Sequence, residues 1–241
     1  MDNIFKVFFS ISTIFVLSAC DFLGFEKRQA EVCKNLLNEA HINSPLNDFD
    51  HNKFSDLLDT RYSLYKEMFE EASEETSIDT DLLAAISFQE SQWDPKAISS
   101  MGVRGMMMVT LETAAIVGVE KRLNPEQNIK GGAKYLAILL DKNIYGKTSG
   151  DQLSISLASY NLGPTNIINI ANTIDKEPSE ITWFDIEAKL DNINGADVNL
   201  RDVDNYSRGQ QAIDYVYRIK NYYDLMAAYS CTDIKDQVTF F

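Results

Sequence analysis

The sequence is poor in the residues from which most metal and redox sites are built. Its 241 residues include three cysteines and two histidines. The histidines, His41 and His51, both precede the region in which we expect the folded domain. It contains neither a Cys-x-x-Cys pair, nor a His-Glu-x-x-His motif, nor a glycine-rich phosphate loop. We therefore expect no metal site and no cofactor.

Basic residues are also scarce. Lys and Arg number 22 against 36 Asp and Glu, and the formal net charge is −14. Because a nucleic-acid-binding protein needs Lys and Arg to neutralise phosphates, we expect no nucleic acid partner. Like charges form no long run, so the acidity is typical of a solvated surface. The hydrophobic fraction of 45% is that of a globular protein.

The N-terminal apolar run is too short to span a membrane. It covers residues 7–19, whereas a spanning helix needs about 20 residues. It follows Lys6 and has the length of a signal-peptide core, so residues 1–19 are predicted to be a signal peptide. Its end, Leu17-Ser18-Ala19-Cys20, resembles the lipobox of bacterial lipoproteins. That resemblance implies a lipid on Cys20 and a protein anchored to the inner or outer membrane, facing the periplasm; an ordinary signal peptide is the alternative.

The two remaining cysteines lie at opposite ends of the chain. Export would place Cys33 and Cys231 in an oxidising compartment. They could form a disulfide that joins the N-terminal segment to the tail. Since the sequence does not establish that their Cα atoms are close, paired and free cysteines both stay open.

Helical periodicity dominates the rest of the chain. Residues 20–53 are polar and are predicted to be a tether with one short helix near 27–40, residues 54–230 the folded domain, and 231–241 a tail. Within the domain, helices are predicted at 54–73, 79–91, 111–117, 124–141, 151–162, 165–172, 183–190 and 210–229. Residues 95–109 are predicted to be a loop or hairpin that pivots on Gly102 and Gly105. No convincing alternating strand is present, so the fold class is all-α.

Several helix ends carry recognisable signals. Asp94-Pro95 should close the second helix, because a residue before proline avoids the helical region. Thr110 is a predicted N-cap, and Gly118 a stop. Asn124-Pro125-Glu126-Gln127 combines a capping Asn, Pro at the first helical position and Gln at the reciprocal capping-box position.

One acid stands in an unusual place. Leu83, Ile86 and Glu90 are spaced three and four residues apart, so all three lie on one stripe of a helix. Burial against apolar side chains raises the pKa of a carboxyl group and allows it to donate a proton near neutral pH. Glu90 is therefore the candidate general acid.

Three short segments become informative when they are taken together. They are Glu90-Ser91, Gly102 to Met108 and Ser159-Tyr160-Asn161-Leu162-Gly163-Pro164. Taken singly, they could be an exposed helix end, methionine core filler and a helix stop. In this order and at these spacings, they resemble the catalytic domain of the family 1 lytic transglycosylases. The match continues through 124–136 and Tyr215-Val216, and it covers roughly 57–229.

The resemblance implies a helical domain of the soluble-lytic-transglycosylase type, related to goose lysozyme within the lysozyme-like superfamily, with a substrate groove. The membrane-bound lytic transglycosylase F type is the most similar branch. Proteins of that branch carry a large solute-binding-like domain before the catalytic one, where this chain has only a short segment. We therefore expect the catalytic domain without that partner domain, and we expect a monomer.

The family also implies an activity, the cleavage of the MurNAc–GlcNAc β-1,4 bond of peptidoglycan glycan strands with formation of 1,6-anhydro-MurNAc. Glu90 would act first as acid and then as base. Carried over by position, the substrate-binding residues would be Ser91, Ser99, Met106, Met107, Met108, Tyr160, Asn161 and Tyr215. Ser159 replaces the usual Ala. Met108 replaces the usual Gln, which would shift substrate contacts toward apolar ones.

Two other functions stay open. A hydrolytic muramidase would need a second carboxylate to position water, for which Asp94 and Glu112 are weak candidates. An inactive glycan-binding lipoprotein would keep the groove without the chemistry. A semi-buried acid that costs stability argues against the pure binder.

Overall fold

The computed structural model describes residues 31–36, 38–39, 46–99, 101–192 and 207–238. The chain divides into two compact units, Pro45–Met226 and a smaller one made of Met1–Ser44 with Ala227–Phe241. Within the described residues, no helix has the length and apolarity needed to cross a membrane. The predicted signal peptide and Cys20 lie outside the described residues.

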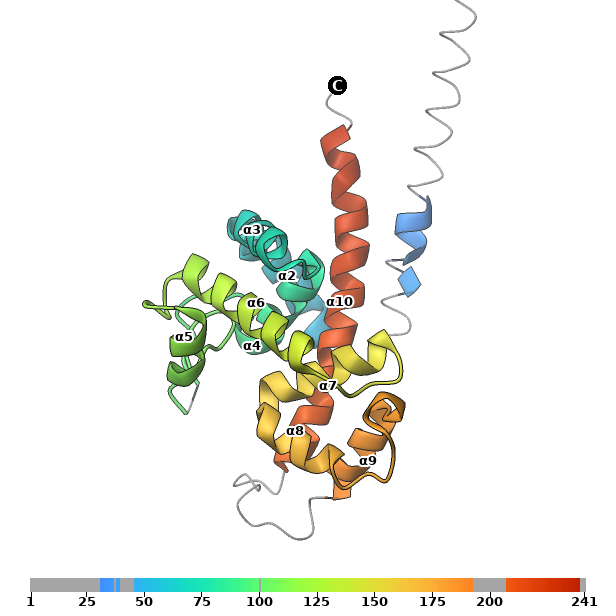
Figure 1. Cartoon of the computed structure of the whole chain (residues 1–241). Helices are drawn as coiled ribbons and strands as arrows, with labels where there is room; N and C mark the ends of the chain where they lie inside the picture. Colours follow the sequence, from blue (N-terminus) through green and yellow to red (C-terminus); the bar gives the residue numbers. More distant parts are fainter. Residues whose placement is uncertain (1–30, 37, 40–45, 100, 193–206, 239–241) are drawn as a thin grey trace, which may run out of the picture. The chain divides into compact units, whose positions relative to one another are not determined.

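The described part of the chain is helical, which confirms the all-α prediction (Figure 1). Its helices are α2 (Asp48–Thr60), α3 (Lys66–Thr76), α4 (Thr80–Ser91), α5 (Leu111–Val117), α6 (Pro125–Lys142), α7 (Ser149–Leu162), α8 (Pro164–Ala171), α9 (Trp183–Asn192) and α10 (Arg208–Val238). Short 3-10 turns occupy Tyr62–Leu64 and Pro178–Glu180. The segment 95–109, predicted to be a loop or hairpin, contains two isolated antiparallel bridges, Ile98 with Arg104 and Arg104 with Val109.

The first predicted helix, 54–73, is wrong because the structure divides it into α2 and α3. α2 also begins earlier, at Asp48, where Asn47 accepts a hydrogen bond from the Asp50 amide. The chain leaves helical geometry at Arg61, whose guanidinium donates to the Gln92 carbonyl at 3.0 Å. This contact with a distant segment explains why periodicity alone did not reveal the break.

α4 has the predicted extent but a different ending. The Asp79 side chain caps its start by accepting from the Asp81 and Leu82 amides. At its end, Gln92 and Trp93 adopt left-handed backbone conformations with φ of 55° and 56°. Trp93 then turns back, and its indole donates to the Ala84 carbonyl at 2.9 Å. The helix is therefore closed before Asp94-Pro95, and the prediction of a proline stop is wrong.

The caps of α5 and α6 confirm most of the local signals. Thr110 accepts from the Thr113 amide, and Gly118 takes the left-handed conformation that ends α5. Asn124 accepts from the Gln127 amide, with Pro at the first position of α6. The reciprocal capping-box bond is absent, because Gln127 Oε1 instead accepts from the amides of Glu120 and Lys121. Gln127 thus holds the loop that leads into α6.

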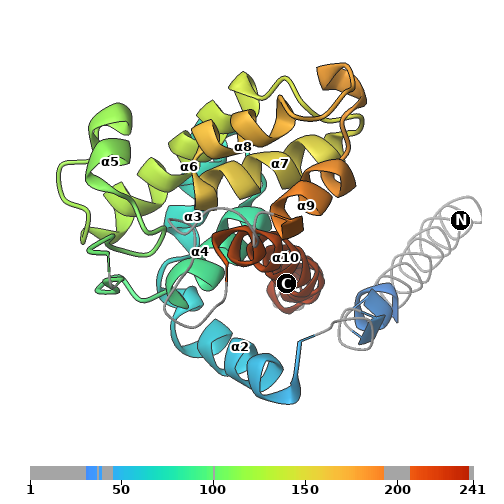
Figure 2. The ribbon, with the colours of Figure 1, turned by 90° about the horizontal axis from the view of Figure 1, so that it is seen from below.

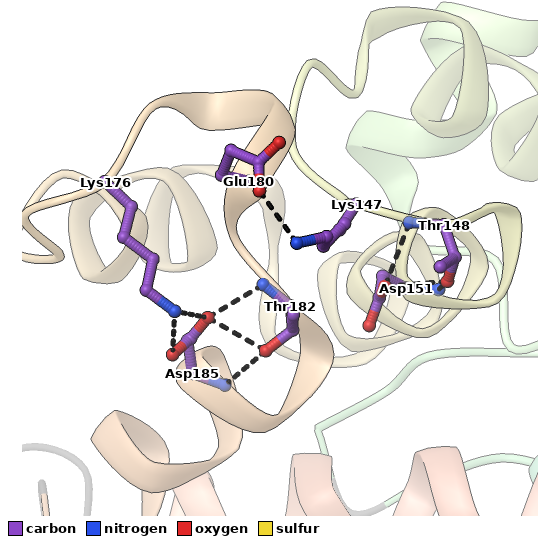
Figure 3. A network of polar contacts seen from close by, with 7 residues as sticks. All are labelled: Lys147, Thr148, Asp151, Lys176, Glu180, Thr182 and Asp185. Carbon is purple, nitrogen blue, oxygen red and sulfur yellow. Dashed lines mark hydrogen bonds and ion pairs between the residues drawn. The ribbon is translucent and has the colours of Figure 1, made fainter.

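Polar side chains fix the starts of α7 and α9 (Figure 3). Thr148 and Asp151 form a capping box at α7, and Thr182 and Asp185 exchange the same pair of bonds at α9. Asp151 Oδ1 also accepts from the Trp183 amide at 2.8 Å, so one carboxylate caps both helices. This clamp sets the direction of α7, whose other end carries Tyr160 and Asn161.

Helix packing places α4 at the centre of the larger unit. α3 packs on α4 and α6, α6 packs on α7, and α8 and α9 pack on α7. Figure 2 shows α4 beside α10, a neighbour relation that two side-chain hydrogen bonds confirm. Lys130 joins α6 to Glu71 and Glu75 of α3 at 3.0 and 3.1 Å. Between these neighbouring helices, residues 82–88 of α4 are all buried.

The smaller unit contains the disulfide. Residues 31–36 are helical. In the structure Cys33 is paired with Cys231, their Cα atoms are 5.5 Å apart, and Cys33 is buried. Of the two alternatives left open by the sequence, the structure has the paired one.

Candidate functional site

Glu90 occupies the last turn of α4, directly after the buried residues 82–88, and the residue as a whole is only partly exposed. The Tyr215 hydroxyl on α10 donates a hydrogen bond to Glu90 Oε1 at 2.6 Å. Burial raises the pKa of Glu90 from its ordinary 4.5 to about 7, while the Tyr215 bond pulls that pKa down. No second carboxylate within the described residues contributes to this raised pKa. The carboxyl group is therefore poised to give up and take back a proton near neutral pH.

Two tyrosines flank this acid from different helices. Tyr215 comes from α10, and Tyr160 from the end of α7, where its hydroxyl donates to the Met107 carbonyl at 2.8 Å. Burial raises the pKa of both tyrosines well above 10, and the nearby charge of Glu90 raises it further. Both hydroxyls therefore stay protonated and act as hydrogen-bond donors. The structure thus brings together three of the predicted residues, Glu90, Tyr160 and Tyr215.

The segment Gly102 to Met108, called the methionine loop below, is held from both sides by polar side chains. Ser91 and Ser87 donate their hydroxyls to the Met106 carbonyl at 2.9 and 3.2 Å. From α6, the fully buried Asn128 accepts from the Met107 amide at 2.7 Å. Ser91 therefore lies where the prediction placed it, beside Glu90, but it bonds to protein backbone.

Gly105 and Gly132 allow the methionine loop to approach its neighbours this closely. Gly105 has a φ of +84°, and a Cβ there would lie 2.3 Å from the Arg122 carbonyl. A Cβ on Gly132 would lie 2.4 Å from Met107 Cβ. Gly132 is therefore the point at which α6 packs closely against Met107.

The side chains of Met106 and Met107 do not line an open groove. Both are fully buried, so the prediction that they contact sugars is wrong for this structure. A three-residue apolar run does not reveal which of its members points inward. Their backbone carbonyls, bonded to Ser91 and Tyr160, are what they present toward the site.

Met108 and Ser99 differ from this pair. Met108 has a positive φ of 45°, is partly exposed and lines a pocket. Ser99 lies apart from that pocket, in a tight turn where its hydroxyl oxygen accepts from the Val103 amide at 3.1 Å. The structure therefore gives Ser99 a loop-closing contact, whereas Met108 faces the open space that a ligand would need.

A pocket of about 820 Å³ opens between α5, α6, α7 and α8. Met108, Tyr135, Tyr160 and Asn161 supply its aromatic and polar lining, while apolar side chains make much of the rest: Ile116, Ile138, Leu139, Ile144 and Ile168. The rings of Tyr135 and Tyr160 lie 5.4 Å apart. Tyr160 belongs both to this pocket and to the surroundings of Glu90.

Comparison with known proteins assigns the central segment. Residues 67–182 match the family model described as "Transglycosylase SLT domain". The chain therefore contains an SLT transglycosylase domain. The SLT domain so defined contains Glu90, Ser91, the methionine loop, Tyr160 and Asn161.

Relatives of the chain are longer proteins. It is 34% identical over 213 residues to "Membrane-bound lytic murein transglycosylase F" of Photobacterium profundum, which covers 87% of this chain and 40% of the relative. It is 38% identical over 174 residues to "Membrane-bound lytic murein transglycosylase F 2" of Alkalilimnicola ehrlichii. That alignment covers 70% of this chain and 38% of the relative. The chain thus spans about two fifths of the length of these curated relatives.

Among solved structures, an inactive mutant of lytic transglycosylase Slt from Pseudomonas aeruginosa aligns with a TM-score of 0.48 and 18% sequence identity. The alignment covers 69% of this chain and 24% of that one.

Tyr215 and Arg218 lie outside the matched SLT segment, and residues both inside and outside it were missed by the sequence analysis. Tyr215 was predicted, although α10 follows the match. Gln89 and Arg218, which are hydrogen-bonded to each other beside the Glu90–Tyr215 pair, were not predicted. Ser87 and Asn128 were missed as well. A polar residue on the apolar face of a helix is the signal that could have found both, since each is fully buried.

Proposed function

We propose that this protein is a peptidoglycan lytic transglycosylase that cleaves the MurNAc–GlcNAc β-1,4 bond and forms 1,6-anhydro-MurNAc. The observation that carries the proposal is Glu90, a carboxyl group whose pKa is raised to about 7 mainly by burial. Retaining and inverting glycosidases commonly use two carboxyl groups, one of which activates water or attacks the sugar. A single poised acid suits a reaction in which the substrate supplies its own nucleophile.

The proposed reaction has two proton transfers through one residue. Protonated Glu90 donates to the glycosidic oxygen as the bond from C1 to that oxygen breaks, and the N-acetyl group of MurNAc stabilises C1. The Glu90 carboxylate then takes the proton of the 6-hydroxyl as its oxygen bonds to C1. The enzyme ends as it began, and no water is consumed. Because the pKa is about 7, both protonation states are accessible at neutral pH.

The neighbouring residues support this cycle. Tyr215 donates to Glu90 Oε1 at 2.6 Å, which favours the carboxylate formed after the first step. Tyr160, Asn161 and Met108 line the adjoining pocket, where they would contact the glycan. Met108 offers a thioether at that wall, so the contact it makes would be with the apolar face of a sugar ring.

A hydrolase would need Asp94 or Glu112 to position water. Asp94 Oδ1 accepts from the Lys96 amide at 2.9 Å in a turn. Glu112 is exposed on α5, at the wall of the pocket. Neither contributes to the raised pKa of Glu90. The single-acid mechanism therefore remains the better supported of the two.

We also propose that Cys20 carries a lipid, and that this tether holds the catalytic domain, proposed as residues 54–230, at a membrane in the periplasm. The lipobox-like Leu17-Ser18-Ala19-Cys20 supports this. Expression of the full chain and of Cys20→Ser, followed by mass measurement of the N-terminal peptide, tests it. A peptide that begins at Cys20 with added acyl mass is expected, and an unmodified peptide would overturn the anchor.

Digestion of purified sacculi tests the reaction. Anhydro-muropeptides, each one water lighter than the hydrolysed product, are expected from the wild type and not from Glu90→Gln. Products that all carry a reducing end would identify a hydrolytic muramidase instead. Binding to sacculi with no product from the wild type would identify a glycan-binding protein.

A further inference from the structure

We propose that Arg218 is a positioning residue, which fixes the register of α10 against α4 and so holds the Tyr215 hydroxyl on Glu90. This inference rests on the proposed function, because it concerns the acid of that reaction. The residues involved join three helices of the larger unit, α2, α4 and α10.

Two neighbouring side-chain bonds connect α4 to α10. Tyr215 donates to Glu90 at 2.6 Å, and Arg218 Nε donates to Gln89 Oε1 at 3.1 Å. Gln89 and Glu90 are consecutive on α4. Tyr215 and Arg218 are three apart on α10, so they project from one face of that helix. Figure 2 shows α4 beside α10. A bond at Arg218 therefore restrains rotation and sliding of the segment that carries Tyr215.

Arg218 is itself held by groups on other helices. Its Nη2 donates to the Tyr222 hydroxyl at 3.0 Å and lies 3.5 Å from Asp50 Oδ2 on α2. The guanidinium carbon also lies 5.9 Å from the centre of the Tyr222 ring. A planar guanidinium with five donors can make such contacts together, whereas a lysine ammonium cannot match this geometry. Arg218 thus bridges α2 and α4 from α10.

An aromatic cluster makes the base of this bridge rigid. The ring of Tyr222 stacks on Phe54 of α2 at 5.5 Å and meets Phe88 of α4 edge-on at 4.6 Å. Phe88 lies 4.7 Å from Trp93, which follows the end of α4. Because Phe88 and Glu90 belong to the same helical turn, movement of this cluster would move the acid as well.

The charges around the two bonds allow the role of Arg218 to be separated from a direct field effect. Asp50 faces Arg218 from α2, while Asp214 and Tyr222 face it from α10. Tyr215 of α10 and Tyr160 of α7 both face Glu90 of α4. Burial raises the pKa of Asp214 and the charge of Arg218 partly offsets that rise, but Arg218 is not among the causes that shift the pKa of Glu90. A change at Glu90 after loss of Arg218 would therefore pass through Tyr215.

The test compares four full-length proteins: wild type, Arg218→Met, Tyr215→Phe and the double variant. The pKa of Glu90 is read by carbon-13 NMR of its carboxyl group, assigned with Glu90→Gln, and kcat is measured as anhydro-muropeptide release across pH. Removing the Tyr215 bond removes an effect that lowers the pKa, so Tyr215→Phe should shift it upward. Arg218→Met should shift it in the same direction by less. The double variant should match Tyr215→Phe alone.

Turnover should fall with the loss of position. About tenfold is expected for Arg218→Met, within the roughly 100-fold that a 1 Å misplacement can cost. Gln89→Leu removes the acceptor and keeps Arg218, so it should reproduce the upward shift. Lys220→Met, an exposed cation on the same helix, is the matched control and should leave the pKa unchanged.

Two outcomes would overturn the positioning role. One is a lower melting temperature for Arg218→Met with an unchanged pKa of Glu90. The other is a double variant whose shift is the sum of the two single shifts. The NMR titration needs no turnover, so it decides this inference even if wild-type digestion gives no anhydro product. Digestion without anhydro product would contradict the proposed function and leave the positioning role of Arg218 to the NMR result.

Discussion

Two carboxylates at opposite ends of their helices show how position decides the chemistry of an acid. Glu90 lies in the last turn of α4 and has its pKa raised to about 7. Asp185 lies in the first turn of α9 and has its pKa lowered to about 2. A helix C-terminus carries partial negative charge, which raises the pKa of a nearby carboxyl group. A helix N-terminus carries partial positive charge, which lowers it, so both placements agree with the two pKa shifts.

The partners of the two groups explain most of the difference. Asp185 accepts from Lys176 at 2.7 and 2.8 Å, and from the amide and hydroxyl of Thr182 (Figure 3). These four bonds favour its charged form. Burial disfavours the charged form of Glu90, and only the hydrogen bond from the Tyr215 hydroxyl is among the causes that favour it. Many donors make a capping residue, whereas few donors leave a carboxyl group free to exchange its proton.

The largest expected effect is the loss of activity in Glu90→Gln. An amide keeps the shape but can neither donate nor accept the proton, so anhydro-muropeptide release should fall by at least about 10³-fold. Asp185→Asn is the matched carboxylate-to-amide control and should keep near wild-type turnover in folded protein. If both variants lost activity equally, the contrast between the two carboxylates would not reflect catalysis.

Stability against pH should separate the same two residues. The pKa of Glu90 is above its ordinary 4.5, so the folded state holds the proton more tightly and stability falls as pH rises from about 4.5 to about 7. Glu90→Gln removes that loss, which should make it more stable than the wild type at pH 8, by about 3 kcal/mol. Urea unfolding at pH 4 and pH 8 measures this, with a smaller difference expected at pH 4. Equal differences at both pH values would mean that the acid is not buried as described.

Tyr160→Phe tests whether the site depends on the hydrogen bond from Tyr160 to Met107 as well as on the burial of Glu90. The change removes the donor to the buried Met107 backbone and leaves its carbonyl unsatisfied, which should lower stability by about 1–3 kcal/mol. Tyr145→Phe is the control, because the hydroxyl of Tyr145 donates to another side chain, Asn172, at 3.3 Å. Thermal unfolding and anhydro-product release are the measurements. A stability loss equal to that of the control would contradict the assigned role of the hydroxyl.

Local signals predicted much of this architecture, and contacts between distant segments explain what they missed. The caps at Thr110 and Asn124 follow from residues within one turn, as does the stripe that carries Glu90. The break at Arg61 depends on a carbonyl 31 residues away. The Arg218–Gln89 bond joins residues 129 apart, and no periodicity encodes such a pair. Met107 was wrongly predicted to contact sugars, because its burial depends on the packing of α6 against it.

The smallest expected effect concerns Asp185, which completes the comparison from the other side. Its pKa is lowered, so its contribution to stability is present above the unfolded value near 3.8 and disappears as pH falls through about 2. Because Asp185 is partly exposed, its loss in Asp185→Asn should cost only about 1 kcal/mol at pH 7, as for other helix caps. Lys189→Gln, in the last turn of the same helix, is the matched control. Unfolding at pH 7 and pH 2 should show the difference from wild type shrinking at the lower pH, since protonated Asp185 already resembles the amide. A difference that stayed constant with pH would assign the stability to packing, and the charged cap would not be its source.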